Sequence, residues 1–598
     1  MESNYVDWYG YDGENFPSEI PEVNYGGDIE EMNWIAGDFE TSNSDINIKE
    51  KYTRVWLWDI YDHDKKTHYN GDDIETFFDA LFTYPSIIIY FHNLKFDGSF
   101  ALNYLLSNGF KISNSHENMT ISTLITDRLV WYTFTVYYCG CKYVFRDSMK
   151  KIIGTIANAA KAFDLPIMKG EIDYKLHRDK GYKPTEKELA YIHNDTEIMS
   201  DILEYYYANG MTSITNASDA MKAYKSIIGE KKYKHLYPIL SKEIDDFIRA
   251  SYKGGYCYLN PKFANKDLGV MYTYDVKSMY PSVMAYADLP FGVPVHYDGA
   301  YEEDKLMPLF IQKIHVDCKL KEGHVPSIQS KSFMSIKLNY LKNTDGMTIE
   351  LTLTSLDLMN LFEDYDIYSI DFIEGYKFRS SKDLFREYVD FYYEKKETSK
   401  GALKQLYKIF LNSLYGKFAM MTERSQAIPQ ILEGVNKYDR TELEEVDATY
   451  TAVASFITAS ARFKLLRAIR ANLENFVYCD TDSIHLLKPI KERPELYTLG
   501  KKLGDFDLEN GTYSPEGLPI SEIKRARYLG QKCYVLDMGN GLKKKIAGAP
   551  DKVKEQIDWD NFHIGFTSDE NEYPKMRMEN VKGGVLLIPT TFTIKAKD

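Results

Sequence analysis

The stretch Phe476-Val477-Tyr478-Cys479-Asp480-Thr481-Asp482-Ser483-Ile484-His485 places two short apolar runs on either side of two aspartates. Such runs, bounded by turn-forming residues, predict a β-hairpin whose tip carries the acids. Asp480 and Asp482 are two residues apart, so in an extended chain their side chains leave the same face. A hard divalent cation such as Mg²⁺ relieves the repulsion between two such carboxylates. An ordinary polar turn, in which Asp and Thr are common, explains the same residues without a cation.

The bulk composition predicts a large protein of several domains. At 598 residues the chain is too long for one hydrophobic core. The net charge of −15 argues against a wholly basic surface, but it leaves room for a local basic groove, because only clustered Lys and Arg contact phosphates. We expect no signal peptide, because the N-terminus lacks an apolar segment, and no membrane span. The six scattered cysteines are typical of reduced thiols in a cytoplasm.

Two predicted strands in the first third of the chain carry acids. Residues 33–41 form the first strand, with Asp38 and Glu40 on one face. Residues 87–91 form the second, a buried strand that runs into a loop containing Asp97.

Two predicted helices follow these strands. The first covers residues 99–108, and the second opens at the capping-box pattern Thr185-Glu186-Lys187-Glu188. Tyr191 and Asp195 are four residues apart on the second helix and share a face. Each acid alone is more often a solvated surface residue, but together they suggest a site in which two cations activate a water and steady the leaving oxygen of a phosphodiester. We therefore expect four carboxylates to converge: Asp38, Glu40, Asp97 and Asp195.

The later two thirds of the chain carry a further acid, a glycine pair and an amphipathic helix. A predicted strand over residues 270–275 ends in Asp275. Gly254-Gly255 lets the backbone approach something bulky, although a structural turn explains the pair almost as well. Residues 403–414 predict an amphipathic helix, for which a surface helix with solvated lysines is the alternative reading. Its apolar stripe is Leu403, Leu406, Tyr407, Phe410 and Leu414, and its other side carries Lys404, Lys408, Asn412 and Tyr415.

These motifs, in this order, resemble those of family B DNA polymerases. The resemblance runs from residue 36 to residue 595 and includes the phrases Tyr90-Phe91-His92-Asn93-Leu94-Lys95-Phe96-Asp97-Gly98 and Leu411-Asn412-Ser413-Leu414-Tyr415-Gly416-Lys417-Phe418-Ala419. It implies an α/β (α+β) multidomain fold, with a ribonuclease H-like exonuclease domain and a right-hand core of palm, fingers and thumb.

The resemblance assigns roles to residues of the first third. Asp38, Glu40, Asp97 and Asp195 match the metal ligands of the 3′→5′ exonuclease, and Tyr191 matches the residue that orients the attacking water. Lys169 matches a lysine placed near the scissile phosphate. The family's contacts to the single-stranded primer end fall on His92, Asn93, Phe96, Ser148 and Met149, where Met149 replaces the usual Leu.

In the polymerase half, Asp275-x-x-Ser278-Met279-Tyr280-Pro281 resembles the palm motif, with Met279 in the usual Leu position. The resemblance implies that Asp275, the Val276 carbonyl and Asp482 hold metal, and that Asp480 belongs to the catalytic residues. Tyr280 would lie under the incoming sugar and exclude a 2′-OH. The nucleotide-binding residues implied are Val276, Tyr280, Lys396, Lys408 and Tyr415, and the DNA-binding residues are Tyr252, Gly254, Gly255, Thr458, Arg462, Lys532 and Tyr534.

The implied cofactors are two Mg²⁺ ions in each active site, with Mn²⁺ as an alternative, and the implied substrates are dNTPs. Between Asp275 and Lys408 the chain is longer than a palm-to-fingers connection needs, and a second additional piece follows the fingers helix. Two insertions at these points resemble those of the protein-primed replicases of small tailed phages. The implied partners are template–primer DNA, a terminal (priming) protein and a single-strand binding protein, for a monomer in the cytoplasm of an infected bacterium.

The resemblance divides the chain into eight segments. They are an acidic leader (1–32), the exonuclease domain (33–215), the first part of the palm (216–286), a terminal-protein insertion (287–385), the fingers (386–419), a processivity and strand-displacement insertion (420–451), the second part of the palm (452–550) and the thumb (551–598).

Four other readings remain open. The protein could be the replicase of a linear plasmid, a nuclease whose second half only binds DNA, or a non-catalytic DNA-binding scaffold. A reverse transcriptase is the fourth, although Asp480-Thr481-Asp482 lacks adjacent aspartates and an exonuclease domain would be unusual there.

Overall fold

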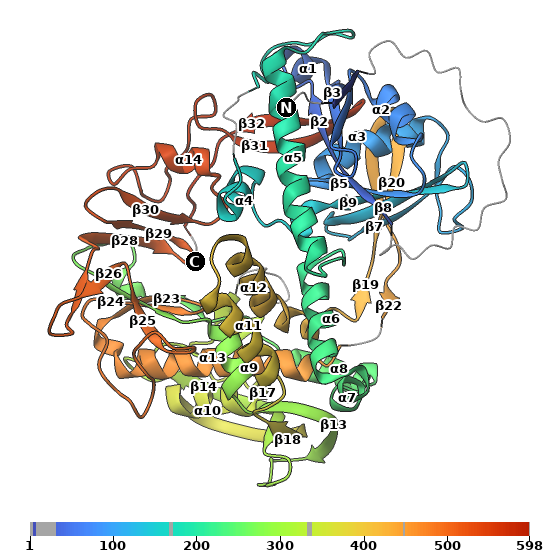
Figure 1. The fold of residues 1–598 in the computed structure, drawn as a ribbon. Helices are drawn as coiled ribbons and strands as arrows, with labels where there is room; N and C mark the ends of the chain where they lie inside the picture. Colours follow the sequence, from blue (N-terminus) through green and yellow to red (C-terminus); the bar gives the residue numbers. More distant parts are fainter. Residues whose placement is uncertain (1–3, 8–31, 167–171, 332–337, 447–448, 597–598) are drawn as a thin grey trace.

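The computed structural model describes residues 4–7, 32–166, 172–331, 338–446 and 449–596. It is a mixed α/β structure in which an N-terminal unit sits beside a larger one (Figure 1). The long helix α5 (Glu186–Ala208) runs along the N-terminal unit toward the larger one. In the described residues, no helix is long and apolar enough to cross a membrane.

The N-terminal unit is built on a nine-stranded mixed sheet. Its central strands are apolar and buried, and α2 (Ile74–Leu81) and α3 (Leu94–Ser107) pack against them. Helix α5 packs against two of its strands, β2 and β3. In spatial order the strands are β1 (Asn4–Asp7), β4 (Thr67–Gly71), β3 (Val55–Asp62), β2 (Trp34–Thr41), β5 (Ile87–Phe91), β9 (Cys141–Asp147), β8 (Trp131–Tyr138), β7 (Thr120–Ile125) and β6 (Lys111–Ile112).

The larger unit contains a five-stranded sheet centred on the predicted hairpin. The hairpin prediction is confirmed, because β23 and β24 pair antiparallel across a turn at Thr481-Asp482. Helix α13 (Thr451–Ala471) packs on α9 (Met279–Tyr286) and also contacts β24. The strand order is β10 (Cys257–Leu259), β23 (Phe476–Asp480), β24 (Ser483–Leu486), β12 (Tyr272–Val276) and β25 (Phe506–Glu509).

Residues 289–381 contain a four-stranded antiparallel sheet. Its strands, in spatial order, are β13 (Leu289–Asp298), β18 (Tyr365–Ser381), β14 (Leu309–Leu320) and β17 (Ile349–Thr354), and helix α10 (Ser355–Asp364) follows β17. The sequence pattern predicts a strand over residues 348–353 and a helix over residues 355–362, and β17 and α10 confirm both within one and two residues.

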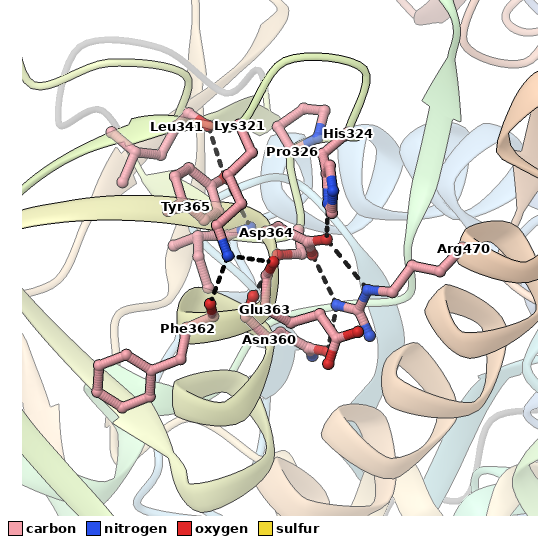
Figure 2. A network of polar contacts seen from close by, with 12 residues as sticks. Lys321, His324, Pro326, Leu341, Asn360, Phe362, Glu363, Asp364, Tyr365 and Arg470 are labelled. Carbon is pink, nitrogen blue, oxygen red and sulfur yellow. Dashed lines mark hydrogen bonds and ion pairs between the residues drawn. The ribbon is translucent and has the colours of Figure 1, made fainter.

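A network of hydrogen bonds and ion pairs joins helix α10 to α13 (Figure 2). The guanidinium of Arg470 donates two hydrogen bonds to the carboxylate of Asp364, at 3.0 and 2.6 Å, and a third to Asn360 Oδ1 at 2.8 Å. His324 Nδ1 lies 2.9 Å from the same carboxylate. Lys321 Nζ donates to the backbone carbonyls of residues 362 and 363 at the end of α10. Because bidentate Arg–carboxylate pairs fix geometry as well as distance, this network sets how α10 sits on α13.

Helices α11 (Arg386–Thr398) and α12 (Gly401–Ser413) pack together as a pair. The predicted amphipathic helix is α12, and its Leu406, Phe410 and the following Leu414 are buried. The prediction of Leu403 in the apolar stripe is wrong, since its side chain is 39% exposed; Leu411 is buried instead. Leu403 lies in the first turn of α12, where few neighbours cover it.

Two late segments return to the N-terminal unit (Figure 1). The hairpin β20 (Ala427–Leu432) and β21 (Val435–Arg440) contacts α3, and β32 (Gly584–Thr590), paired with β31 (Lys575–Val581), also contacts α3. Backbone hydrogen bonds join residue 53 to residue 582, and Asn43 pairs with the backbone of Leu587. The sequence predicts strand structure over residues 565–595 with a break at Gly583-Gly584; the break is confirmed, but residues 565–574 form no strand.

Candidate active sites

The first cluster of acids lies between the sheet and α5. Asp38 and Glu40 point from β2, Asp97 lies in the first turn of α3, and Asp195 is on α5. The prediction that Asp97 belongs to a loop is wrong, because α3 begins at Leu94 directly after β5. Asn93, with φ 71°, turns the chain into the helix within one residue.

Burial raises the pKa of these acids, and their mutual charge raises several of them further. The pKa of Glu40 rises to about 8, first through burial and then through the charges of Asp195 and Asp97. Burial raises the pKa of Asp195 to about 6. The pKa of Asp38 is well above its usual range through burial and then through Asp97 and its other neighbours. Carboxylates that repel one another in a buried place fit a divalent cation, since Mg²⁺ takes carboxylate oxygens.

Two tyrosines border this cluster. Tyr191 hydrogen-bonds to Asp195, as their spacing of four on α5 predicts. Tyr174, which the sequence did not single out, hydrogen-bonds to Glu40 and to Tyr191. Its motif-free loop, residues 172–185, offered no periodicity from which to predict this position. Lys169, predicted beside the same acids, lies outside the described residues.

His92 and Ser148, both predicted to contact a single strand, contact each other. His92 Nδ1 lies 2.9 Å from Ser148 Oγ, and His92 Nε2 lies 2.8 Å from the carbonyl oxygen of Gly154. Ser148 is fully buried, and its contact with DNA stays a prediction. Its neighbour Met149 is 39% exposed. Phe96 is partly buried and packs near Phe100.

Asp147 organises these residues, although the sequence suggested no role for it. Its Oδ1 accepts backbone hydrogen bonds from Asn93, Leu94 and Met149, at 3.1–3.3 Å. Its Oδ2 lies 3.0 Å from Lys150 Nζ. A carboxylate at the end of β9 therefore joins the start of α3, directly after β5, to the turn after β9.

The second cluster of acids forms where β12 meets the hairpin. The backbone N–H of Val276 donates to the carbonyl of Asp482 at 2.8 Å, and Asp275 lies opposite Ser483 in the strand register. Thr481 has φ 62°, so the turn is tight and Asp482 lies in it rather than in a strand.

The pKa values of Asp275 and Asp482 are both raised by burial and by the charge of a nearby carboxylate. Burial and then the charge of Asp482 raise the pKa of Asp275 to about 7. Burial and then the charge of Asp480 raise the pKa of Asp482 to about 6. Asp480 is instead paired with Lys532, whose Nζ lies 3.2 Å from its Oδ1. The donor set that fits a divalent cation is therefore Asp275 with Asp482, while Asp480 already has a cationic partner.

Two stacked tyrosines and a glycine lie beside this pair. The rings of Tyr280 and Tyr415 stack with centroids 4.3 Å apart. A Cβ on Gly255 would lie 2.9 Å from Thr481 Cγ2 and 3.1 Å from the Tyr280 hydroxyl, so the predicted close approach is confirmed at Gly255. A Cβ on Gly254 would meet nothing within 4 Å. Tyr252 is partly buried next to the same group.

The predicted phosphate-binding lysines lie on α11 and α12. Lys396 Nζ lies 3.2 Å from Ser278 Oγ, directly after β12. Lys408 is exposed, as predicted, and lines a cavity of about 300 Å³ between α12 and α4 (Ile156–Phe163). Lys396 also lies 3.1 Å from Glu397 Oε1, and of the two lysines Lys408 is the more exposed.

The contact of Thr458 and Arg462 with template–primer DNA stays a prediction; in this structure each residue is 1% exposed. Arg462 pairs with Asp357 of α10 through both guanidinium and carboxylate, at 3.2 and 2.6 Å. It also donates to the carbonyls of Lys253 and Gly254, at 2.9 Å each. Arg462 thus holds the backbone at the glycine pair in position.

Lys532 and Tyr534 differ in exposure. The Lys532 side chain is 52% exposed, as a DNA contact requires. Tyr534 is 8% exposed and packs in an aromatic group with Tyr478, Tyr528 and His485. Burial, and then the charges of Glu509 and Asp480, raise the pKa of the Tyr534 hydroxyl.

The chain is similar in sequence to a known family of proteins. Residues 79–182 and 177–494 match the family model described as DNA polymerase type B, organellar and viral. The DNA polymerase of Bacillus phage B103 is 37% identical over 588 residues, which cover 93% of this chain and 99% of that protein. The DNA polymerase of Streptococcus phage Cp-1 is 33% identical over 597 residues, 94% of this chain and 99% of its own.

Solved structures agree with the sequence relatives. Phi29 DNA polymerase complexed with primer–template DNA has a TM-score of 0.86 to this structure at 35% identity, covering 94% of this chain and all of that one. The same polymerase complexed with primer–template DNA and incoming nucleotides has a TM-score of 0.84.

Proposed function

We propose, from the premise that this chain belongs to the phi29-type, protein-primed family B DNA polymerases, that it replicates a linear phage genome from a protein primer. It is a DNA polymerase, that is, a nucleotidyltransferase. Our proposal adds processive synthesis with strand displacement, 3′→5′ proofreading, and action in the cytoplasm of an infected bacterium.

The proposed domain division follows the chain. Residues 33–215 are a ribonuclease H-like exonuclease domain, 216–286 with 452–550 the palm, 386–419 the fingers and 551–598 the thumb. Residues 1–32 remain an acidic leader without an assigned role. Residues 287–385 are proposed to receive the terminal protein, and residues 420–451 to support strand displacement. The contacts of β20 and of β32 with α3 support this division, since they bring the second insertion and the C-terminal hairpin to the exonuclease domain.

For nucleotide addition, Asp275, the Val276 carbonyl and Asp482 are proposed to hold two Mg²⁺ or Mn²⁺ ions. When bound, the ions neutralise the charge that develops on the triphosphate and on the primer oxygen. Lys396 and Lys408 contribute positive charge toward the triphosphate. The ring of Tyr415 packs against the new base pair, and Tyr280, stacked on it, occupies the space that a ribose 2′-OH would need.

DNA contacts are proposed for residues around the same site, of which Tyr534 is the most buried. Tyr252, Gly254 and Gly255 would guide the strand between the two active sites. Lys532 and Tyr534 would hold the primer terminus, with Lys532 also neutralising Asp480.

For proofreading, Asp38, Glu40, Asp97 and Asp195 are proposed to hold a second pair of ions, which supply a nucleophilic water. Tyr191 orients that water, and Lys169 neutralises the scissile phosphate. His92, Asn93, Phe96 and Met149 would receive the single-stranded end, with Ser148 holding the His92 ring. The protein is proposed to act as a monomer, with template–primer DNA and a single-strand binding protein as further partners.

The observation that carries this proposal is the presence of two separate groups of mutually repelling carboxylates, on β2, α3 and α5 and on β12 and the hairpin. Asp482→Ala is expected to abolish nucleotide addition and to leave single-strand degradation intact. Asp38→Ala combined with Asp97→Ala should show the reverse. The assay is extension and degradation of one labelled primer; loss of both activities in either variant contradicts the assignment of separate sites.

Protein priming and strand displacement need their own assays. Purified protein with a primed single-stranded circle, dNTPs and Mg²⁺, without a helicase, is expected to give products many times the length of the circle. Products that stop at one circle length would exclude unaided strand displacement. Initiation requires the cognate terminal protein, and transfer of a labelled dNMP to its hydroxyl is the direct readout.

A further inference from the structure

A polar cluster separate from both groups of acids lies among β3, β4 and α5. It consists of Asp59 on β3, His68 on β4 and His193 on α5, and one ligand atom from each lies within 4.8 Å of the others. His68 Nδ1 is 2.9 Å from Asp59 Oδ2, and His193 Nε2 is 3.5 Å from Asp59 Oδ1. Asp59 is fully buried and His68 is 5% exposed. Asp38 is the strand neighbour of Asp59 across β2 and β3.

One buried carboxylate oxygen is not used by the hydrogen bonds of the cluster. In the part of the chain that the structure describes, Asp59 Oδ1 has no hydrogen-bond donor. His193 Nε2 faces it and lies 3.3 Å from Asn70 Nδ2, the geometry in which the ring nitrogen accepts from the amide. The buried oxygen Asp59 Oδ1 therefore lies 3.5 Å from a ring nitrogen that does not donate to it, which is costly in a buried place and is relieved by a cation.

Second groups hold two of these side chains in position. Thr196 Oγ1 donates to Asp59 Oδ2 at 2.6 Å. Glu197 Oε1 lies 2.9 Å from His68 Nε2, the nitrogen that faces away from Asp59. Metal-binding histidines usually donate their other ring N–H to a carboxylate in this way, which fixes the tautomer and the ring orientation.

We propose that Asp59, His68 and His193 form a site for one divalent transition-metal ion of the zinc class. Two imidazoles and a carboxylate are the ligand set that Zn²⁺ takes, whereas Mg²⁺ prefers oxygen alone. Binding displaces the Nδ1 proton of His68 to solvent, and the two stacked rings, with centroids 4.0 Å apart, turn apart to direct both nitrogens at the ion. The His193 side chain is 19% exposed, so water can reach a fourth coordination position.

An ion here would join β3 and β4 to α5. His193 stands between Tyr191 and Asp195 in the sequence of α5, so the ion would fix the helix that carries them. The consequence is structural, and it holds whether or not the neighbouring acids degrade DNA.

The test uses metal-free full-length protein titrated with Co²⁺ in the presence of excess Mg²⁺, which occupies the carboxylate sites. Four- or five-coordinate Co²⁺ with nitrogen ligands absorbs visible light many times more strongly than octahedral Co²⁺. We expect one equivalent of intense absorption, displaced by Zn²⁺. It should be lost in His193→Ala and in His68→Ala, and Glu197→Gln should weaken binding 10- to 100-fold.

The matched control is His315→Ala, an exposed histidine 3.4 Å from Glu350, which should leave the Co²⁺ spectrum unchanged. Circular dichroism checks that each variant is folded; should His68→Ala unfold, His193→Ala and Glu197→Gln still decide. As a second readout, Zn²⁺ should raise the Tm of the wild type and not that of His193→Ala. Absorption of octahedral intensity, or an equal spectrum in His193→Ala, would overturn the proposal and leave a hydrogen-bonded network in its place.

Discussion

Gly255 offers the sharpest test of how the polymerase site is held together. Thr481 and the Tyr280 hydroxyl lie close to the position that a Cβ on Gly255 would occupy, at 2.9 and 3.1 Å from it. Thr481 precedes Asp482, and Tyr280 stacks on Tyr415. Gly255→Ala must therefore displace either the turn that carries one acid or the tyrosine pair.

The size of the effect follows from the cost of overpacking, which is typically about 1–3 kcal/mol for an added methyl group in a packed site. If the neighbours move rather than the whole fold, that cost falls on the catalytically competent arrangement. With about 1.4 kcal/mol for each factor of ten, we expect nucleotide addition to slow by roughly 5- to 150-fold.

The assay is single-nucleotide extension of a primed template, measured beside degradation of a single strand. Gly254→Ala is the matched comparison, because a Cβ at Gly254 would meet nothing within 4 Å, so it should slow extension less than Gly255→Ala does. Degradation should be unchanged in both variants. Equal extension by Gly255→Ala and Gly254→Ala would refute the argument that close packing at this position sets the site.

Three further predictions concern other parts of the molecule. Tyr280→Ala opens the space beneath the incoming sugar, so we expect ribonucleotide incorporation to rise at least tenfold relative to deoxyribonucleotides; unchanged sugar selectivity would remove the assigned role. Asp357→Asn leaves Arg462 buried without its counter-charge and should lower the free energy of unfolding by about 3–5 kcal/mol in urea titrations, whereas Asp390→Asn, at the exposed pair with Arg386, should change it by less than about 1 kcal/mol. The acids Glu40, Asp275, Asp195 and Asp482 have folded pKa values of about 8, 7, 6 and 6, above their unfolded values, so the folded state binds more protons between pH 4 and 8. In EDTA the free energy of unfolding should therefore fall as the pH rises through this range, and Mg²⁺ should restore it at pH 8; stability that rises with pH in EDTA would contradict the proximity of these acids.

The sequence predicted the elements whose signal is local. The hairpin around Asp482, the strand at residues 87–91 and the capping box at Thr185 are all present, because apolar alternation and capping depend on near neighbours. Asp97 was misplaced because Gly98 and the polar start of α3 look like a loop, whereas buried neighbours hold them in a helix.

The contacts that join distant segments could not be predicted. Arg462 reads as one more basic residue in a helix until Asp357, 105 positions earlier, supplies its counter-charge. Asp147 and Tyr174 likewise gain their roles from segments far away in the chain. Asp59, His68 and His193 have no motif spacing at all, since they come from three elements brought together by the sheet and α5.

The position of the last strand pair, β31 and β32, has a consequence for folding during synthesis. Val585 on β32 is a buried member of the same apolar core as Phe100 and Ile89, and Ala427 on β20 is another. A ribosome releases residues 33–215 long before either segment emerges, so this first-made core must wait, incompletely covered, until the end of synthesis. Fragments cut before residue 575 should inherit that uncovered surface and aggregate, even though they contain every predicted exonuclease residue.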